Sequence, residues 1–120
     1  MTHRARSLGT AAVFGAIAVL LLGFPAPIWW LFALEGGGEA ALMGRRAAML
    51  FAGLTVLCFL LRDAGPTPER RGAAAAISVA MGGLAVLGLA EWLRGAIGPG
   101  VLVAVAVEIS LVALWAREPE

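Results

Sequence analysis

Residues 72–90 read GAAAAISVAMGGLAVLGLA, a run without a charged side chain that decides the fold class. At about 1.5 Å per residue, a helix of this length spans roughly 29 Å, which matches the ~30 Å hydrocarbon layer of a bilayer. The rest of the chain is similar: 61% of its 120 residues are hydrophobic, 14% are charged, and the mean hydropathy is +0.91. Soluble domains usually have about a quarter charged residues and cannot bury so much apolar surface. The composition therefore predicts a membrane protein.

Three further segments have the composition of membrane spans, and turn residues separate them. The four predicted spans are residues 8–24, 40–61, 72–92 and 101–116. All should be helical, because an open strand leaves backbone groups unpaired in lipid. Thr67 followed by Pro68 predicts an N-cap and a helix start near Pro68, and Pro99 is expected in the first turn of the last helix. The sequence thus predicts an all-α fold, one integral membrane four-helix bundle over residues 1–120.

Two prolines follow the first span, and they either kink a long helix or end it. We favour a break at Pro25 and Pro27, with an interfacial segment over about 26–34. Trp29 and Trp30 in this segment are typical of the headgroup level. The N-terminal span is expected to be a retained anchor, because no small-x-small cleavage site precedes the tryptophans.

Arginine counts in the short connections predict the orientation of the chain. With the N-terminus inside, the inner side has Arg4, Arg6, Arg62, Arg70, Arg71 and Arg117, and the outer half has Arg45, Arg46 and Arg94. This excess predicts two cytoplasmic termini in a bacterial inner membrane, although it is small enough to be compatible with a dual topology. Trp92 and Trp115 are expected to anchor the last two spans at opposite interfaces. Glu91 and Arg94, three residues apart beside Trp92, suit a local interfacial pair.

Few side chains are available for chemistry. The net charge of +1 and the scattered arginines argue against nucleic-acid binding. The single cysteine, Cys58, excludes an internal disulfide and a cysteine-based metal cage. The single histidine, His3, argues against haem ligation, a catalytic triad and a zinc-hydrolase site. We therefore predict no enzymatic activity, no catalytic residue, no metal and no cofactor.

Ionisable groups inside two predicted spans lie at matching depth. Glu108 is roughly 10 Å below the outer end of its span, and Arg45 and Arg46 are roughly 7–9 Å below theirs. Such charges are costly in lipid unless they are paired, and arginine can bind a carboxylate through two parallel hydrogen bonds. We predict that Arg45 pairs with Glu108, whereas Arg46 extends to the outer headgroups.

This ion pair has two interpretations, a clasp that specifies the fold and a charged gate or proton-carrying carboxylate in a small cavity. An arginine beside the carboxylate keeps it charged, which argues against an easily protonated relay.

Apart from this ion pair, helix packing must come from small residues that allow close backbone approach. Such residues recur at helical spacing in every span, and in the last one Ala106, Ser110 and Ala113 lie roughly opposite Glu108.

Three stretches carry a resemblance to known proteins: GRRAAMLFAGL at 44–54, RDAGP at 62–66 and GPGVLVAVAVE at 98–108. They resemble small uncharacterised four-helix inner-membrane proteins of high-GC bacteria, and the likeness extends from Pro25 onward. It implies a small membrane bundle and no reaction. Small multidrug transporters look different, because their essential acid is in the first helix, and small fluoride channels use asparagine, which is absent here.

The sequence therefore predicts a structural or accessory component of a membrane complex, without chemistry of its own. The expected partners are the lipid bilayer and either further copies of the chain or a larger complex. The alternative is a small oligomeric transporter or channel that uses Glu108 with Arg45.

Overall fold

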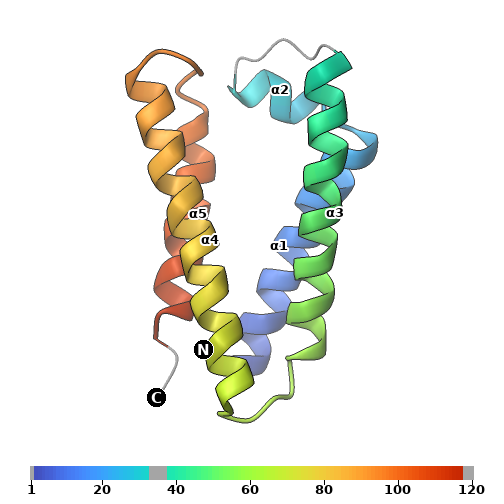
Figure 1. Cartoon of the computed structure of the whole chain (residues 1–120), viewed down its shortest axis with the longest axis vertical. Coiled ribbons are helices and arrows are strands. Elements are labelled where there is room, and N and C mark those ends of the chain that lie inside the picture. Colours follow the sequence, from blue (N-terminus) through green and yellow to red (C-terminus); the bar gives the residue numbers. More distant parts are fainter. Residues whose placement is uncertain (1, 33–37, 118–120) are drawn as a thin grey trace. The chain divides into compact units, whose positions relative to one another are not determined.

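The computed structural model describes residues 2–32 and 38–117, and every regular element within these residues is an α-helix (Figure 1). The helices are α1 His3–Gly23, α2 Ala26–Phe32, α3 Gly38–Leu60, α4 Pro68–Leu93 and α5 Val101–Trp115. The predicted all-α class is confirmed. Three helical segments are long and apolar enough to cross a membrane, namely α1, residues 42–60 of α3, and α4, while α5 is apolar but shorter. Residues 33 and 34 of the predicted interfacial segment lie outside the described residues.

The helix boundaries follow local backbone chemistry. α1 ends at Gly23 and α2 begins at Ala26, so the predicted break is confirmed at Pro25, whereas Pro27 lies within α2. Proline has no N–H to continue a helical ladder. The Thr67 side chain accepts a hydrogen bond from the Arg70 amide, and α4 starts at Pro68 as expected.

The last helix begins at the first residue of the predicted span 101–116, but Pro99 lies outside it. α5 begins at Val101 with Gly100 as its N-cap, so Pro99 precedes the helix and its placement in the first turn was wrong. The amides of Val101, Leu102 and Val103 each bond to the carbonyl three residues earlier. This tight turn accommodates the proline before regular α-helical bonding begins.

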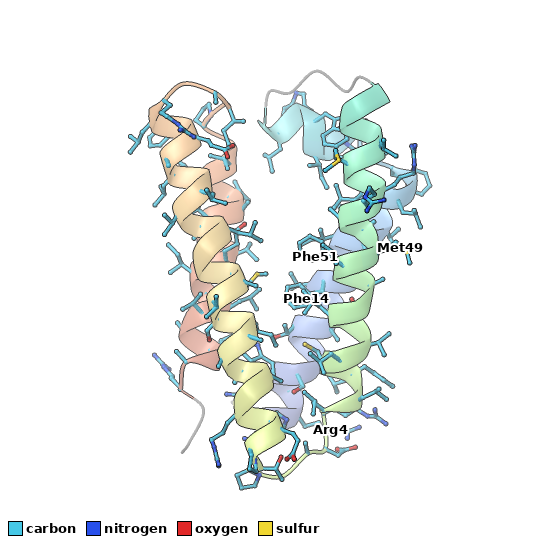
Figure 2. All side chains as sticks on the ribbon, viewed as in Figure 1. Arg4, Phe14, Met49 and Phe51 are labelled. Carbon is cyan, nitrogen blue, oxygen red and sulfur yellow. The ribbon has the colours of Figure 1, made fainter. Side chains whose placement is uncertain are left out.

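The chain divides into two compact units, residues 1–63 and 64–120. In the first unit α1 and α3 form an antiparallel hairpin (Figure 1). Phe14 of α1 is fully buried, and its ring centroid lies 5.7 Å from that of Phe51 in α3; Figure 2 shows both rings between the two helices. A Cβ on Gly44 would lie 3.1 Å from the Trp29 ring, so glycine allows α2 to cover α3 at this point.

The second unit is an antiparallel hairpin of α4 and α5. A Cβ on Gly88 would lie 3.1 Å from Val105 and 3.2 Å from Val101, and one on Gly82 would lie 3.9 Å from Val112. These contacts fix the register of the two helices. The core is completed by buried side chains of both helices: Ala74, Ile77, Met81, Ala85, Leu111 and Trp115. Packing of all four long helices in one bundle stays a prediction.

Gly88→Ala is expected to destabilise the α4–α5 hairpin by about 1 kcal/mol. Overpacking a tight contact costs typically 1–3 kcal/mol, which exceeds the gain of about 0.8–1 kcal/mol in helix propensity. Gly83 in the same helix is the matched control, because a Cβ there meets nothing within 4 Å. When unfolding is measured in mixed micelles, Gly83→Ala should leave the free energy of unfolding unchanged or raise it. Equal effects of the two substitutions would contradict the register.

Candidate functional site

Glu108 lies on the side of α5 that faces α4. Together with Val101, Val105, Val112 and Trp115 it forms a series in which successive residues of α5 are 4, 3, 4 and 3 positions apart. The three valines of this series lie near Gly88 or Gly82 of α4. These contacts place Glu108 level with Ala85, near the middle of the hairpin. The side chain is half-buried, and its Oε2 atom is buried without a hydrogen-bond partner in the described residues. An acidic group therefore lies on an otherwise apolar helix interface.

The facing part of α4 offers this carboxylate no side-chain donor, because its nearby residues are Gly82, Ala85 and Gly88. The Ser110 hydroxyl of α5 donates to the Ala106 carbonyl at 2.7 Å. The Ser78 hydroxyl lies two helical turns from Ala85, roughly 10 Å along α4. A polar group buried without a partner is costly in apolar surroundings. A donor or cation from outside this hairpin, or a proton on the carboxyl group itself, would lower this cost.

Arg45 and Arg46 are both exposed on α3, beside the buried Gly44. Arg45 belongs to the first unit and Glu108 to the second, and their pairing stays a prediction. Glu91 and Arg94 form no ion pair in the described part of the chain; Arg94 is the C-cap of α4 and its amide bonds to the Ala90 carbonyl.

The four tryptophans have different environments. Trp30 is 81% exposed on α2, whereas Trp29 in the same helix covers Gly44. Trp92 is half-buried near the end of α4. Trp115 is only 1% exposed, which is typical of a packing residue. The exposed Trp30 ring is the most suitable of the four for the headgroup level.

A group of polar side chains that the sequence did not predict lies at one end of the first hairpin. This terminal polar cluster joins the first turn of α1 to the end of α3 and consists of His3, Arg4, Arg6, Ser7, Arg62 and Asp63 with the Leu61 carbonyl. His3 Nε2 lies 2.6 Å from the Leu61 oxygen and 3.2 Å from Ser7 Oγ, and His3 Nδ1 lies 2.8 Å from Arg6 Nη2. Arg4, labelled in Figure 2, donates to Asp63. The i, i+3, i+4 spacing of His3, Arg6 and Ser7 could have indicated a shared helix face.

The Asp63 carboxyl predicts an acid dependence of the first hairpin. A hydrogen bond from Arg4, together with the charges of Arg4 and Arg62, holds the pKa of Asp63 below its ordinary value. A carboxyl with a lowered folded-state pKa stabilises the fold above its unfolded pKa of about 3.9 and loses this contribution as the pH falls through the folded value. The Asp63→Asn variant should therefore lose less stability than the wild type below about pH 4.

The measurement is the melting temperature in detergent micelles between about pH 6 and pH 2.5. Arg4→Gln removes the hydrogen bond and one of the two arginine charges that lower the pKa of Asp63, so this variant should also show a weaker acid dependence than the wild type. Parallel curves for wild type and Asp63→Asn would contradict the prediction.

No group of three His, Cys, Asp or Glu side chains in the described residues could hold a metal ion. Comparison with protein-family models, curated proteins and solved structures found no match. The features of the described residues that bear on function are the exposed helix faces, Glu108 and the terminal polar cluster.

Proposed function

We propose that this chain is a small multi-pass protein of a bacterial inner membrane whose helices α1, α3, α4 and α5 form one bundle with both termini in the cytoplasm. Support comes from three helices of spanning length and from the antiparallel contact of α5 with α4. The excess of arginine in the inner connections supports the orientation.

Labelling of single cysteines in a Cys58→Ala background tests this orientation. Ala64→Cys should react only from the cytoplasmic side and Ala96→Cys only from the outside; the reverse pattern would overturn the orientation.

The proposed role is that of a structural or accessory component of a membrane complex. The observation that carries it is the small-residue face of α5, formed by Ala106, Ser110 and Ala113, all of which are exposed. Small side chains allow the backbones of two membrane helices to approach closely. One side of α5 packs against α4, and this second side is available to a helix of a partner or of another copy.

Photo-crosslinking tests this role in intact membranes. A photoreactive residue at Ala106 or Ala113 should give a discrete protein adduct, whereas one at Val79 or Val86, exposed on α4, should give mainly lipid adducts. An adduct of twice the 12.3 kDa chain mass would identify a second copy, and a different mass would identify another subunit. Lipid adducts alone from all four positions would overturn the accessory role.

A small oligomeric transporter or channel is the second candidate, and the partnerless Oε2 atom of Glu108 favours it. A carboxylate inside a membrane protein often marks an ion or proton path. Purified protein in liposomes tests this function by ion flux. A flux that the Glu108→Gln variant abolishes would support transport, whereas the same background leak for wild type and variant would support the accessory role.

A further inference from the structure

Two guanidinium groups from different parts of the first hairpin meet at one carboxylate. Arg4 in the first turn of α1 donates through Nη1 to Asp63 Oδ1, and Arg62 Nε lies 3.6 Å from the other oxygen, Oδ2. The side chains of Arg4 and Arg62 are 56% and 29% exposed. Together the three side chains carry a net charge of +1. Asp63 therefore holds two solvent-accessible cations close together and neutralises only one of them.

Arg62 is fixed by further contacts with the end of α3. Its Nη1 atom donates to the Phe59 carbonyl at 2.8 Å, and its guanidinium carbon lies 4.0 Å from the centre of the Phe59 ring. A guanidinium group has five N–H donors. Within the described residues Arg62 uses one of them in a hydrogen bond and Arg4 uses one, so both side chains retain donors for an anion.

An apolar side of α3 leads to these two arginines. Met49, Ala52, Val56 and Phe59 are spaced 3, 4 and 3 residues apart and therefore share one side of the helix, and Asp63 follows four residues later. The three large side chains of this series are all exposed. From Met49 to Phe59 the helix rises roughly 15 Å, about half of the ~30 Å hydrocarbon layer. This side of α3 thus has the length of one acyl layer and ends at two cations.

The chemistry of these two parts selects one class of ligand. Guanidinium groups bind phosphate oxygens through paired, charge-assisted hydrogen bonds. A headgroup with a charge of −1 complements the net +1 of the arginines and Asp63, whereas a zwitterionic headgroup brings its ammonium group toward two existing cations. The exposed apolar side of α3 adds a surface for an acyl chain, which a free phosphate ion lacks.

We propose that Arg4 and Arg62 bind the phosphate of an anionic phospholipid whose acyl chain lies along Met49, Val56 and Phe59. Asp63 positions the two guanidinium groups for this contact. The site rests on the proposed insertion of α1 and α3 in a membrane, but it is independent of their orientation and of the role proposed for α5.

The lipid selectivity of the wild-type protein tests the site without any variant. Native mass spectrometry of the full chain released from mixed micelles should show an affinity for phosphatidylglycerol on the order of tenfold higher than for phosphatidylcholine with the same acyl chains. Glycerol 3-phosphate, which has the phosphate but no acyl chain, should not displace the bound lipid. Equal affinity for the two lipids, or displacement by glycerol 3-phosphate, would overturn the proposal.

Substitutions of Arg62 separate a defined site from general attraction between charges. Arg62→Gln should lower the affinity for phosphatidylglycerol on the order of tenfold, because it removes a charged donor. Arg62→Lys keeps the charge without the planar fork and should lower the affinity less. Arg117→Gln is the matched control, because it removes an equally charged, exposed side chain after α5 and should leave the affinity unchanged. Equal losses for Arg62→Gln and Arg117→Gln would mean that net charge alone attracts the lipid, and would overturn the site.

Cysteine labelling at Ala64 and Ala96 reports on membrane insertion separately from lipid binding. Reaction of these two positions from opposite sides, combined with equal affinity for both lipids, would overturn the lipid site alone. Reaction of both positions from the same side would overturn the membrane topology on which the site depends.

Discussion

Replacing Phe14 with alanine is expected to destabilise the α1–α3 hairpin by about 3 kcal/mol, the lower end of the range for buried phenylalanine. The ring is completely buried and lies beside Phe51 on the facing helix. In lipid the transfer of apolar surface contributes less than in water, because the acyl chains are themselves apolar. The lost dispersion contacts and the cavity remain as the main cost. Unfolding of the purified protein in mixed micelles measures this loss.

Phe24 provides the matched control, because it is the same residue type and is 67% exposed just after α1. Its replacement with alanine should change the free energy of unfolding by no more than about 0.5 kcal/mol, as is usual for surface positions. Similar losses for the two substitutions would mean that Phe14 does not contribute to a packed interface. A double replacement of Phe14 and Phe51 should cost less than the sum of the single losses, because the residues are in contact.

Helix positions were predictable because the signals are local. The uncharged run at 72–90 predicted a helix of spanning length, and it lies within α4. Thr67 and Pro68 predicted the start of that helix because capping depends on a few adjacent residues. Pro25 ended α1 for the same kind of reason. Pro99 was misplaced because a tight turn and the first turn of a helix have similar sequence preferences.

Side-chain partnerships were less predictable because they depend on register between helices. His3 looked like part of a polar tail, and its bond to the Leu61 carbonyl joins residues 58 positions apart. Trp115 looked like an interface anchor, and its almost complete burial depends on side chains far along the chain. For Glu108, spacing alone predicted a group on a helix face at some depth. Its level between Gly82 and Gly88 followed only from the contacts of the neighbouring valines of α5 with α4.

The predicted pairing of Arg45 with Glu108 should appear as an energetic coupling of at least about 1 kcal/mol in a double-mutant cycle, within the usual range for contacting residues. Arg45→Ala and Glu108→Ala should each destabilise the protein, because each leaves a charge without its partner in the membrane. Arg46, the adjacent exposed arginine, is the matched control. Arg46→Ala should be additive with Glu108→Ala within about 0.5 kcal/mol.

The Glu108→Leu substitution distinguishes a Glu108 that binds Arg45 from a Glu108 without a partner. The two cases predict changes of opposite sign in the free energy of unfolding. The part of α4 level with Glu108 is apolar and contains Met81, Gly82, Ala85 and Gly88, so leucine suits the hairpin itself. If Glu108 binds Arg45, its loss leaves the guanidinium unpaired, and the variant should be destabilised by about 3 kcal/mol. In Arg45→Ala protein there is no guanidinium to leave unpaired, so the same substitution removes only a carboxylate without a partner and should be neutral or stabilising. Stabilisation by Glu108→Leu in the wild-type background would refute the ion pair, because the leucine would then remove only a carboxylate without a partner.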